Sequence, residues 1–157
     1  SWKNEISEYY ESRVPKHKQI WNTKEEVVSY FERVVIPAFE EISEQLKPFV
    51  INVSIKKNFF THTFKARITV YEEEIKSSFL EIAVMVESNS IKFSCGIKNV
   101  SVKNCSKDVE CEKNIGKDFI ISKFMKFFKS REEEVKEHKN LHYRIQNEEF
   151  ARLEEQV

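Results

Sequence analysis

Two cysteines and two histidines have residue types and spacings that could hold a metal ion. The cysteines, Cys105 and Cys111, lie in the run CSKDVEC, and the histidines, His138 and His142, lie in the run HKNLH. Histidines four residues apart share one face of a helix, so both rings could reach one zinc ion. The cysteines fit this role poorly, because a zinc knuckle usually has two to four residues between its cysteines and here five intervene. The sequence therefore predicts no metal and no cofactor, with zinc at these four residues as the alternative.

Little else in the chain is arranged for catalysis. Only two glycines are present, so the chain has no glycine-rich loop of the kind that cradles phosphates. Nearly all of the acidic residues are glutamate, whereas the shorter aspartate is a frequent ligand in magnesium sites. We therefore expect a non-enzymatic protein. A small hydrolase or nuclease, built from scattered residues such as His62, Glu72–Glu74 and His138, is the second alternative.

The cysteines also bear on the compartment of the protein. Three cysteines cannot form a complete set of disulfides, which is typical of a reducing cytosol. We expect Cys95 to be a free thiol that packs with the core, because it lies on the apolar side of a predicted strand. A disulfide between Cys105 and Cys111 would instead fit a secreted protein, as would three N-x-S sequences, at Asn52, Asn99 and Asn104. The sequence predicts a cytoplasmic protein without a transmembrane segment, with secretion as the alternative.

Basic and aromatic residues alternate in two short runs, KKNFF and SKFMKFFKSR. Such interleaving is typical of surfaces on which single-stranded nucleic acid stacks. The basic residues of the two runs are Lys56, Lys57, Lys123, Lys126, Lys129 and Arg131. The whole chain has 26 basic and 26 acidic residues, however, so it lacks the net positive charge usual in nucleic-acid-binding domains. A nucleic-acid-associated protein that uses these residues and the basic face of the sheet is the first alternative function.

The N-terminal third of the chain has the apolar spacing of helices. Trp2, Ile6 and Tyr9 share a face of the first predicted helix. Thr23 followed by Glu26 has the pattern of a capping box and predicts the start of a second helix. Pro37 should kink or split that helix, since it cannot donate a backbone hydrogen bond.

After Pro48 the apolar residues recur at every second position, which is the pattern of strands. Four strands are predicted, around residues 49–56, 64–70, 79–86 and 91–98, and a bulge, a turn or a short fifth strand should begin near Lys98 and Asn99. The short connections favour antiparallel neighbours. Each strand has one apolar and one polar face, so we expect helices to cover only one side of the sheet.

The C-terminal segment contains neither glycine nor proline from Lys117 to Val157, and it predicts one long helix with a possible break near Asn140. The fold class is therefore α+β: N-terminal helices, a four-stranded antiparallel meander and a long C-terminal helix. We divide the chain into a core domain at 1–116 and a helix at 117–157, which packs on the core and extends from it.

A helix of this length is too long to be buried against the core domain, which predicts that its outer part binds a partner. Apolar residues recur along one stripe, which the two histidines join. The predicted partner-binding residues are Val135, His138, His142, Ile145, Phe150 and Leu153. The sequence thus favours an interaction or regulatory protein that forms a homo-oligomer, most simply a homodimer, or binds a partner protein through this helix.

Overall fold

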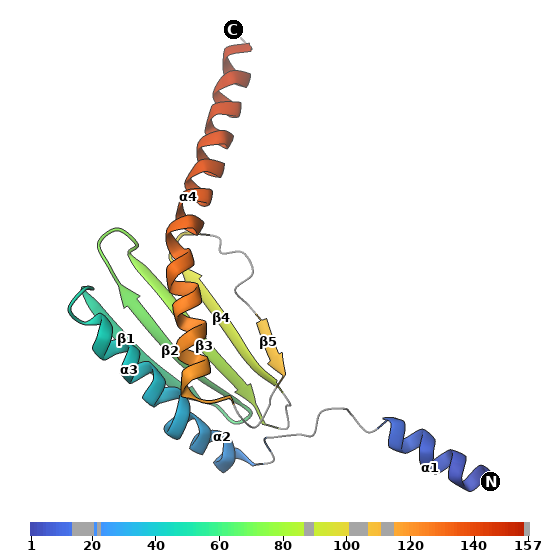
Figure 1. Ribbon diagram of the computed structural model, residues 1–157. Coiled ribbons are helices and arrows are strands. Elements are labelled where there is room, and N and C mark those ends of the chain that lie inside the picture. Colours follow the sequence, from blue (N-terminus) through green and yellow to red (C-terminus); the bar gives the residue numbers. More distant parts are fainter. Residues whose placement is uncertain (14–20, 22, 87–89, 101–106, 111–114, 156–157) are drawn as a thin grey trace.

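An antiparallel sheet with helices against one of its faces forms the body of the protein (Figure 1). The computed structural model describes residues 1–13, 21, 23–86, 90–100, 107–110 and 115–155. The helical segments are α1 (Trp2–Arg13), α2 (Lys24–Tyr30), the π-helical turn η1 (Phe31–Val35), α3 (Ile36–Leu46) and α4 (Lys117–Glu155). The strands are β1 (Asn52–Phe59), β2 (Thr63–Tyr71), β3 (Ser77–Met85), β4 (Ser90–Ile97) and β5 (Lys107–Glu110). The α+β fold class predicted from the sequence is confirmed.

The sheet is a meander in which each strand pairs with its neighbours in sequence, in the order β1-β2-β3-β4-β5. The predicted four-stranded meander is present, and β5 adds a short fifth strand at the edge of β4. Near Lys98 the chain forms a turn, in which Asn99 has a φ of 62° and Val100 bridges back to Ile97. The alternation of side chains directs Phe64, Ile82 and their same-parity neighbours into the core.

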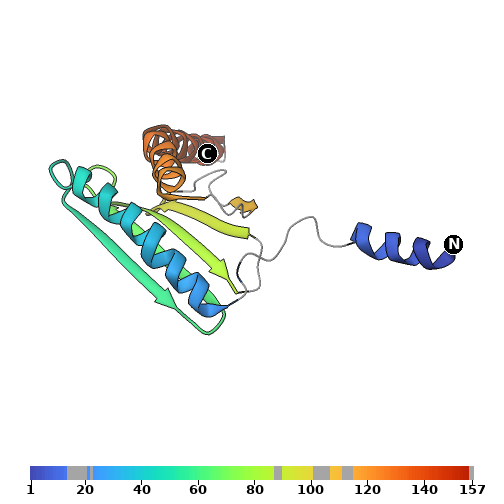
Figure 2. The same cartoon turned by 60° about the horizontal axis from the view of Figure 1, so that its bottom comes forward.

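The segment α2-η1-α3 is one continuous helical rod that lies on the apolar face of the sheet (Figure 2). The side chain of Thr23 accepts a hydrogen bond from the backbone N–H of Glu26, as expected of an N-cap. Pro37 does not split the rod. A π-helical turn precedes it instead, in which the backbone N–H of Ile36 bonds the carbonyl of Phe31, five residues back. Such a turn accommodates a residue that cannot take part in the ordinary hydrogen-bond pattern.

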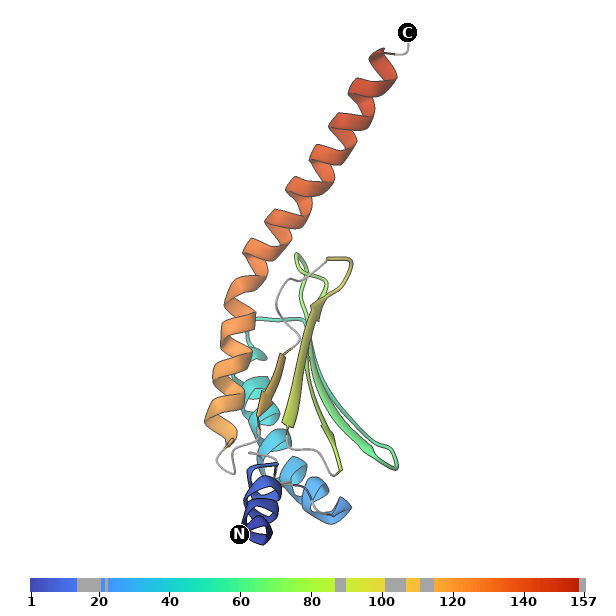
Figure 3. The same cartoon turned by 90° about the vertical axis from the view of Figure 1, so that its right-hand side faces the viewer.

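The helix α4 packs on the same side of the sheet with its first half only (Figure 3). Ile120, Phe124 and Phe127 are its buried apolar residues, and Ile121 and Phe128 flank them as partly buried neighbours. The helix continues through Asn140 without a break, and beyond His138 each described residue is exposed. The outer half therefore projects past the end of the sheet.

The N-terminal helix α1 stands apart from the sheet in the views of Figures 1 and 2. Its predicted apolar residues Trp2, Ile6 and Tyr9 are all exposed. Among the described residues, no helix is long and apolar enough to cross a membrane.

Candidate partner interface on the C-terminal helix

The start of α4 is tied to the helical layer by polar contacts. Lys117 forms an ion pair with Glu41 of α3, with 2.8 Å between Nζ and Oε2. This hydrogen bond and the charge of Glu41 raise the pKa of Lys117 above its ordinary value of 10.5. Just before the helix, the hydroxyl of Tyr30 donates to the carbonyl of the buried Ile115 at 3.2 Å. These contacts fix where the helix begins and the direction in which it leaves the core.

A buried arginine marks the end of the packed half of α4. Arg131 is only 5% exposed. Its Nη1 donates to the carboxylate of Glu72, in the turn after β2, and to Ser78 Oγ of β3 at 2.9 Å. Its Nε donates to the carbonyl of Phe128 at 3.0 Å, and its guanidinium lies 3.5 Å from the centre of the Phe128 ring. Arg131 therefore joins the helix to the sheet, and its burial leaves little of it open to the nucleic-acid contact predicted for it.

The half of α4 beyond Arg131 carries the residues predicted to bind a partner. Val135 and His138 are half-buried, whereas His142, Ile145, Phe150 and Leu153 are exposed. The first four follow one another at spacings of three and four residues, so they share the face of the helix that is buried nearer its start. Phe150 lies one position past this series, so it is rotated by about 100° from the shared face. The predicted stripe is therefore continuous from Val135 to Ile145 and broader beyond it.

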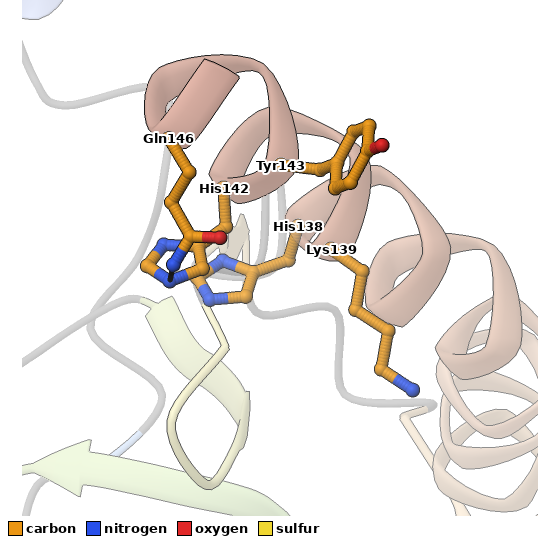
Figure 4. A pocket seen from close by; sticks show the side chains of 5 residues that line it. All are labelled: His138, Lys139, His142, Tyr143 and Gln146. Carbon is orange, nitrogen blue, oxygen red and sulfur yellow. Dashed lines mark hydrogen bonds between the residues drawn. The ribbon is translucent and has the colours of Figure 1, made fainter. Parts of the chain in front are cut away.

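A shallow hollow of about 250 Å³ lies on this part of the helix and is lined by His138, Lys139, His142, Tyr143 and Gln146 (Figure 4). The two histidine rings and the Gln146 amide lie beside one another, with 3.3 Å between Gln146 Nε2 and His142 Nε2. Every lining residue belongs to the same helix, so the hollow is closed on one side only. It is the kind of surface that another chain can cover.

Sequence reasoning missed two large exposed residues on this half, Leu141 and Tyr143, which are 58% and 66% exposed. They lie off the stripe between Val135 and Ile145, and a search for one apolar stripe therefore passes over them. The signal that could have found them is the density of large side chains in a segment that no core residue can cover.

The zinc prediction and the prediction of free cysteines concern Cys95, which the structure describes, and Cys105 and Cys111, which it does not. Within the described part, no group of three or more histidine, cysteine or acidic side chains is arranged to hold a metal. Cys105 and Cys111 lie outside the described residues. Cys95 packs against the core as expected, but it is disulfide-bonded. Its prediction as a free thiol is therefore wrong.

The structure does not bring the residues of the two alternative functions together. Lys56 and Lys57 are neighbours on β1 and point to opposite faces of the sheet. Lys126 and Lys129 lie on α4, whose packed half covers the inner face of the sheet. Lys123 lies on the same helix near the rings of Phe93 and Phe119. The basic residues predicted for the nucleic-acid alternative are thus divided between the two sides of the sheet.

The scattered residues considered for a hydrolase or nuclease are also far apart. His62 precedes β2 and Glu72 follows it, so the strand of nine residues separates them by about 30 Å. His138 lies on the separate helix α4. It is about two turns beyond Arg131, which contacts Glu72. The structure thus separates His62 from Glu72 and does not gather all three groups at one point.

Comparison with protein families, with curated proteins and with solved structures gives no match for this chain. What the protein does must therefore be argued from its own residues.

Proposed function

We propose that this protein is a non-enzymatic interaction protein that self-associates through the projecting half of α4. The observation that supports the proposal is the exposure of large apolar side chains on a helical segment with no core to cover them. Isolated exposed apolar residues are ordinary, but a series of them along one rod is typical of a surface that pairs with another helix. Leu141, Ile145 and Leu153 are three of this series.

The charges of the segment favour an antiparallel pair of helices from two copies. Residues 136–144 carry Lys136, Lys139 and Arg144 against one acidic residue, whereas residues 148–155 carry four glutamates against Arg152. In an antiparallel pair centred between His142 and Ile145, residues 136–144 of each copy lie opposite residues 143–151 of the other, which places Lys139 opposite Glu148. Parallel helices would place like charges together, and would also bring the two core domains to the same end.

Spacing along the shared face suggests the register of this pair. The series Val135, His138, His142 and Ile145 continues at the same spacing to Glu149 and Arg152. When two copies run antiparallel about the middle of the series, His142 meets Ile145 of the second copy. His138 then meets Glu149 of the second copy, which pairs an imidazole with a carboxylate.

Light scattering at micromolar concentration tests the self-association directly. We expect a dimer for the native protein, and a monomer for the double variant Ile145→Lys with Leu153→Lys. The control variant Asn140→Lys with Asn147→Lys adds the same charge on the opposite face of the helix and should remain dimeric. A monomeric native protein at this concentration would contradict the proposal.

Cysteine cross-linking tests the orientation. His138→Cys and Glu149→Cys proteins should cross-link when mixed, and neither should cross-link with itself through the new cysteine. Two copies of the same residue would be about 16 Å apart along the axis of the antiparallel pair, since the two positions are separated by eleven steps of about 1.5 Å. Self-cross-linking of each single variant would indicate a parallel pair.

The compartment also stays a proposal. The cysteine count favours the reducing cytosol, and the disulfide at Cys95 counts against it because such bonds persist mainly in oxidising compartments. Titration of thiols in the unfolded, unreduced protein distinguishes the two. One free thiol would indicate an oxidised protein with one disulfide, and three would indicate a cytosolic protein.

A further inference from the structure

The face of the sheet that points away from the helices is open in Figure 3. Among the side chains of β1–β4 on this face, basic residues outnumber acidic ones. Strand alternation places four described basic residues on this face of β1–β4, and Lys98 continues it just after β4. The five residues are Lys56, Lys65, Arg67, Lys92 and Lys98. Glu81 is the one acidic side chain of β1–β4 on the same face, so these four strands present four cations against one anion there, and Lys98 adds a cation just after β4. The zero net charge of the whole chain conceals this separation.

The single acidic side chain is already neutralised by a partner. Arg67 Nη2 lies 2.8 Å from Glu81 Oε2, on the adjacent strand of the register. The same guanidinium lies 3.9 Å from the centre of the Phe79 ring. Phe79 in turn covers Gly96, where a Cβ atom would lie only 2.5 Å from the ring. An aromatic ring and a cation are thus held on the outer surface by packing among three strands.

A hollow of about 390 Å³ lies beside this cluster. Three basic residues line it, Lys56, Arg67 and Lys98, and no acidic residue does. The rings of Tyr71 and Phe79 and the hydroxyls of Thr69 and Ser77 complete most of its wall. Within the part of the chain that the structure describes, Lys56 and Lys98 form no ion pair. The hollow therefore combines two cations that form no ion pair among the described residues with an exposed aromatic surface.

We propose that this open face of the sheet binds single-stranded nucleic acid, with the hollow at Lys56, Lys98 and Tyr71 as its centre. Phosphates require cations along their path, and unpaired bases stack on aromatic rings whatever their sequence. Tyr71 is 37% exposed and can take a base, whereas the Phe79 ring is partly covered by Arg67. A duplex would present its phosphates without free base faces, so the exposed tyrosine favours a single strand.

Acidic residues limit where the nucleic-acid strand can lie on the sheet. Glu73 and Glu74 are exposed in the turn that follows Tyr71. The nucleic-acid strand should therefore cross the open face from Lys56 on β1 to Lys98 after β4 and keep clear of the turn that carries Glu73 and Glu74. This site lies on the opposite side of the sheet from α4 and is independent of the proposed self-association.

Fluorescence anisotropy with a labelled oligothymidine of about twenty nucleotides tests the proposal on the full chain. We expect a dissociation constant on the order of micromolar at low ionic strength, which weakens as salt is added. The double variant Lys56→Gln with Lys98→Gln should bind at least about tenfold more weakly. The slope of log affinity against log salt should fall by about 1.4, because two phosphate contacts are lost. Tyr71→Ala should weaken binding by about tenfold, and Tyr71→Phe should not, because the phenylalanine ring still stacks.

A charge-matched control separates a built site from general attraction. Lys126→Gln with Lys129→Gln removes the same two charges from exposed positions on α4, and its affinity should stay within about twofold of the native protein. An equal loss for the two double variants would overturn the proposal, as would the absence of binding at low salt. Tighter binding of the matching duplex than of the single strand would also overturn it. Circular dichroism on each variant confirms that the fold is retained.

Discussion

The two halves of α4 are alike in sequence and opposite in surroundings. Both lack glycine and proline, and both combine phenylalanine with many charged residues. Yet Phe124 in the first half is 1% exposed, and Phe150 in the second is 64% exposed. Helix formation depends on local backbone hydrogen bonds and is shared by both halves, whereas burial depends on the sheet that lies beside only one of them.

The two halves of α4 are stabilised by different interactions. Core packing holds the first half, which then serves as a nucleus from which the helix extends at one hydrogen bond per residue. The second half has little besides this extension and its own side-chain pairs to stabilise it. We therefore expect it to fray independently of the core in a monomer and to become protected on association.

The largest contrast should come from truncating one phenylalanine in each half. Phe124→Ala removes a fully buried ring and should lower the free energy of unfolding by about 4 kcal/mol. Phe150→Ala should change it by less than about 0.5 kcal/mol in the monomer, since surface changes rarely do more. Urea denaturation at submicromolar protein concentration measures both. Similar losses for the two variants would mean that the outer half is packed in solution.

Proline substitution makes the same comparison through the backbone. Lys126 and Asn140 are both exposed positions in the helix interior. Lys126→Pro should destabilise the protein by about 3 kcal/mol, because the kinked segment is the one packed on the sheet. Asn140→Pro should reduce helicity by circular dichroism while the denaturation midpoint of the core stays where it is. A shift of that midpoint in Asn140→Pro would contradict the independence of the outer half.

The boundary between the halves should be sensitive to Arg131. Arg131→Met keeps the apolar stem but leaves Glu72 and Ser78 without their partner, and we expect a loss of about 2 kcal/mol in unfolding free energy. The loss is moderate because Glu72 is partly exposed and can turn to water. In the Arg131→Met background, the further substitution Glu72→Gln should change the free energy of unfolding little, because Glu72 has already lost its partner. Strictly additive losses would argue against a direct pairing.

The smallest effect should come from the ion pair at the start of the helix. Because Glu41 raises the pKa of Lys117 above 10.5, the stability contributed by the pair is fully present below pH 10.5. It is lost as the pH rises through the higher pKa of the folded state. Native protein should therefore exceed Glu41→Gln in stability by a constant small amount from pH 7 to pH 9, and the difference should begin to fall near pH 10.5 and vanish above the raised pKa of Lys117. Salt should reduce the difference, since both groups are exposed.

Much of the fold could be predicted from local patterns. Alternation of apolar residues located four strands, and the pair Thr23 and Glu26 located the start of a helix. The absence of glycine and proline after Lys117 predicted the long C-terminal helix, which ends at Glu155. The π-helical turn before Pro37 was less accessible. A proline in a helix indicates that one backbone hydrogen bond is missing, but not whether the helix bends there, ends there or forms a wider π-helical turn.

The candidate sites were harder to predict than the fold. In the run SKFMKFFKSR four basic residues look equivalent, and nothing local indicates that Arg131 alone is buried. Alternation along the strands already predicted a basic face of the sheet, but not which side chains meet on it, because that depends on strand register, which places Lys56 beside Arg67 and Arg67 beside Glu81. The disulfide at Cys95 could not be inferred from an odd number of cysteines.

The sequence by itself determined the elements of this protein: which segments are helical, which are extended, and that its last helix is longer than its core can cover. Only the tertiary structure decided which half of that helix is packed, which arginine is buried and where the charges gather. The physical reason is the range of the interactions. Caps, turns and periodicity act within a few residues, whereas Arg131 is matched to a glutamate 59 residues away, and such a partner exists only once the chain has folded.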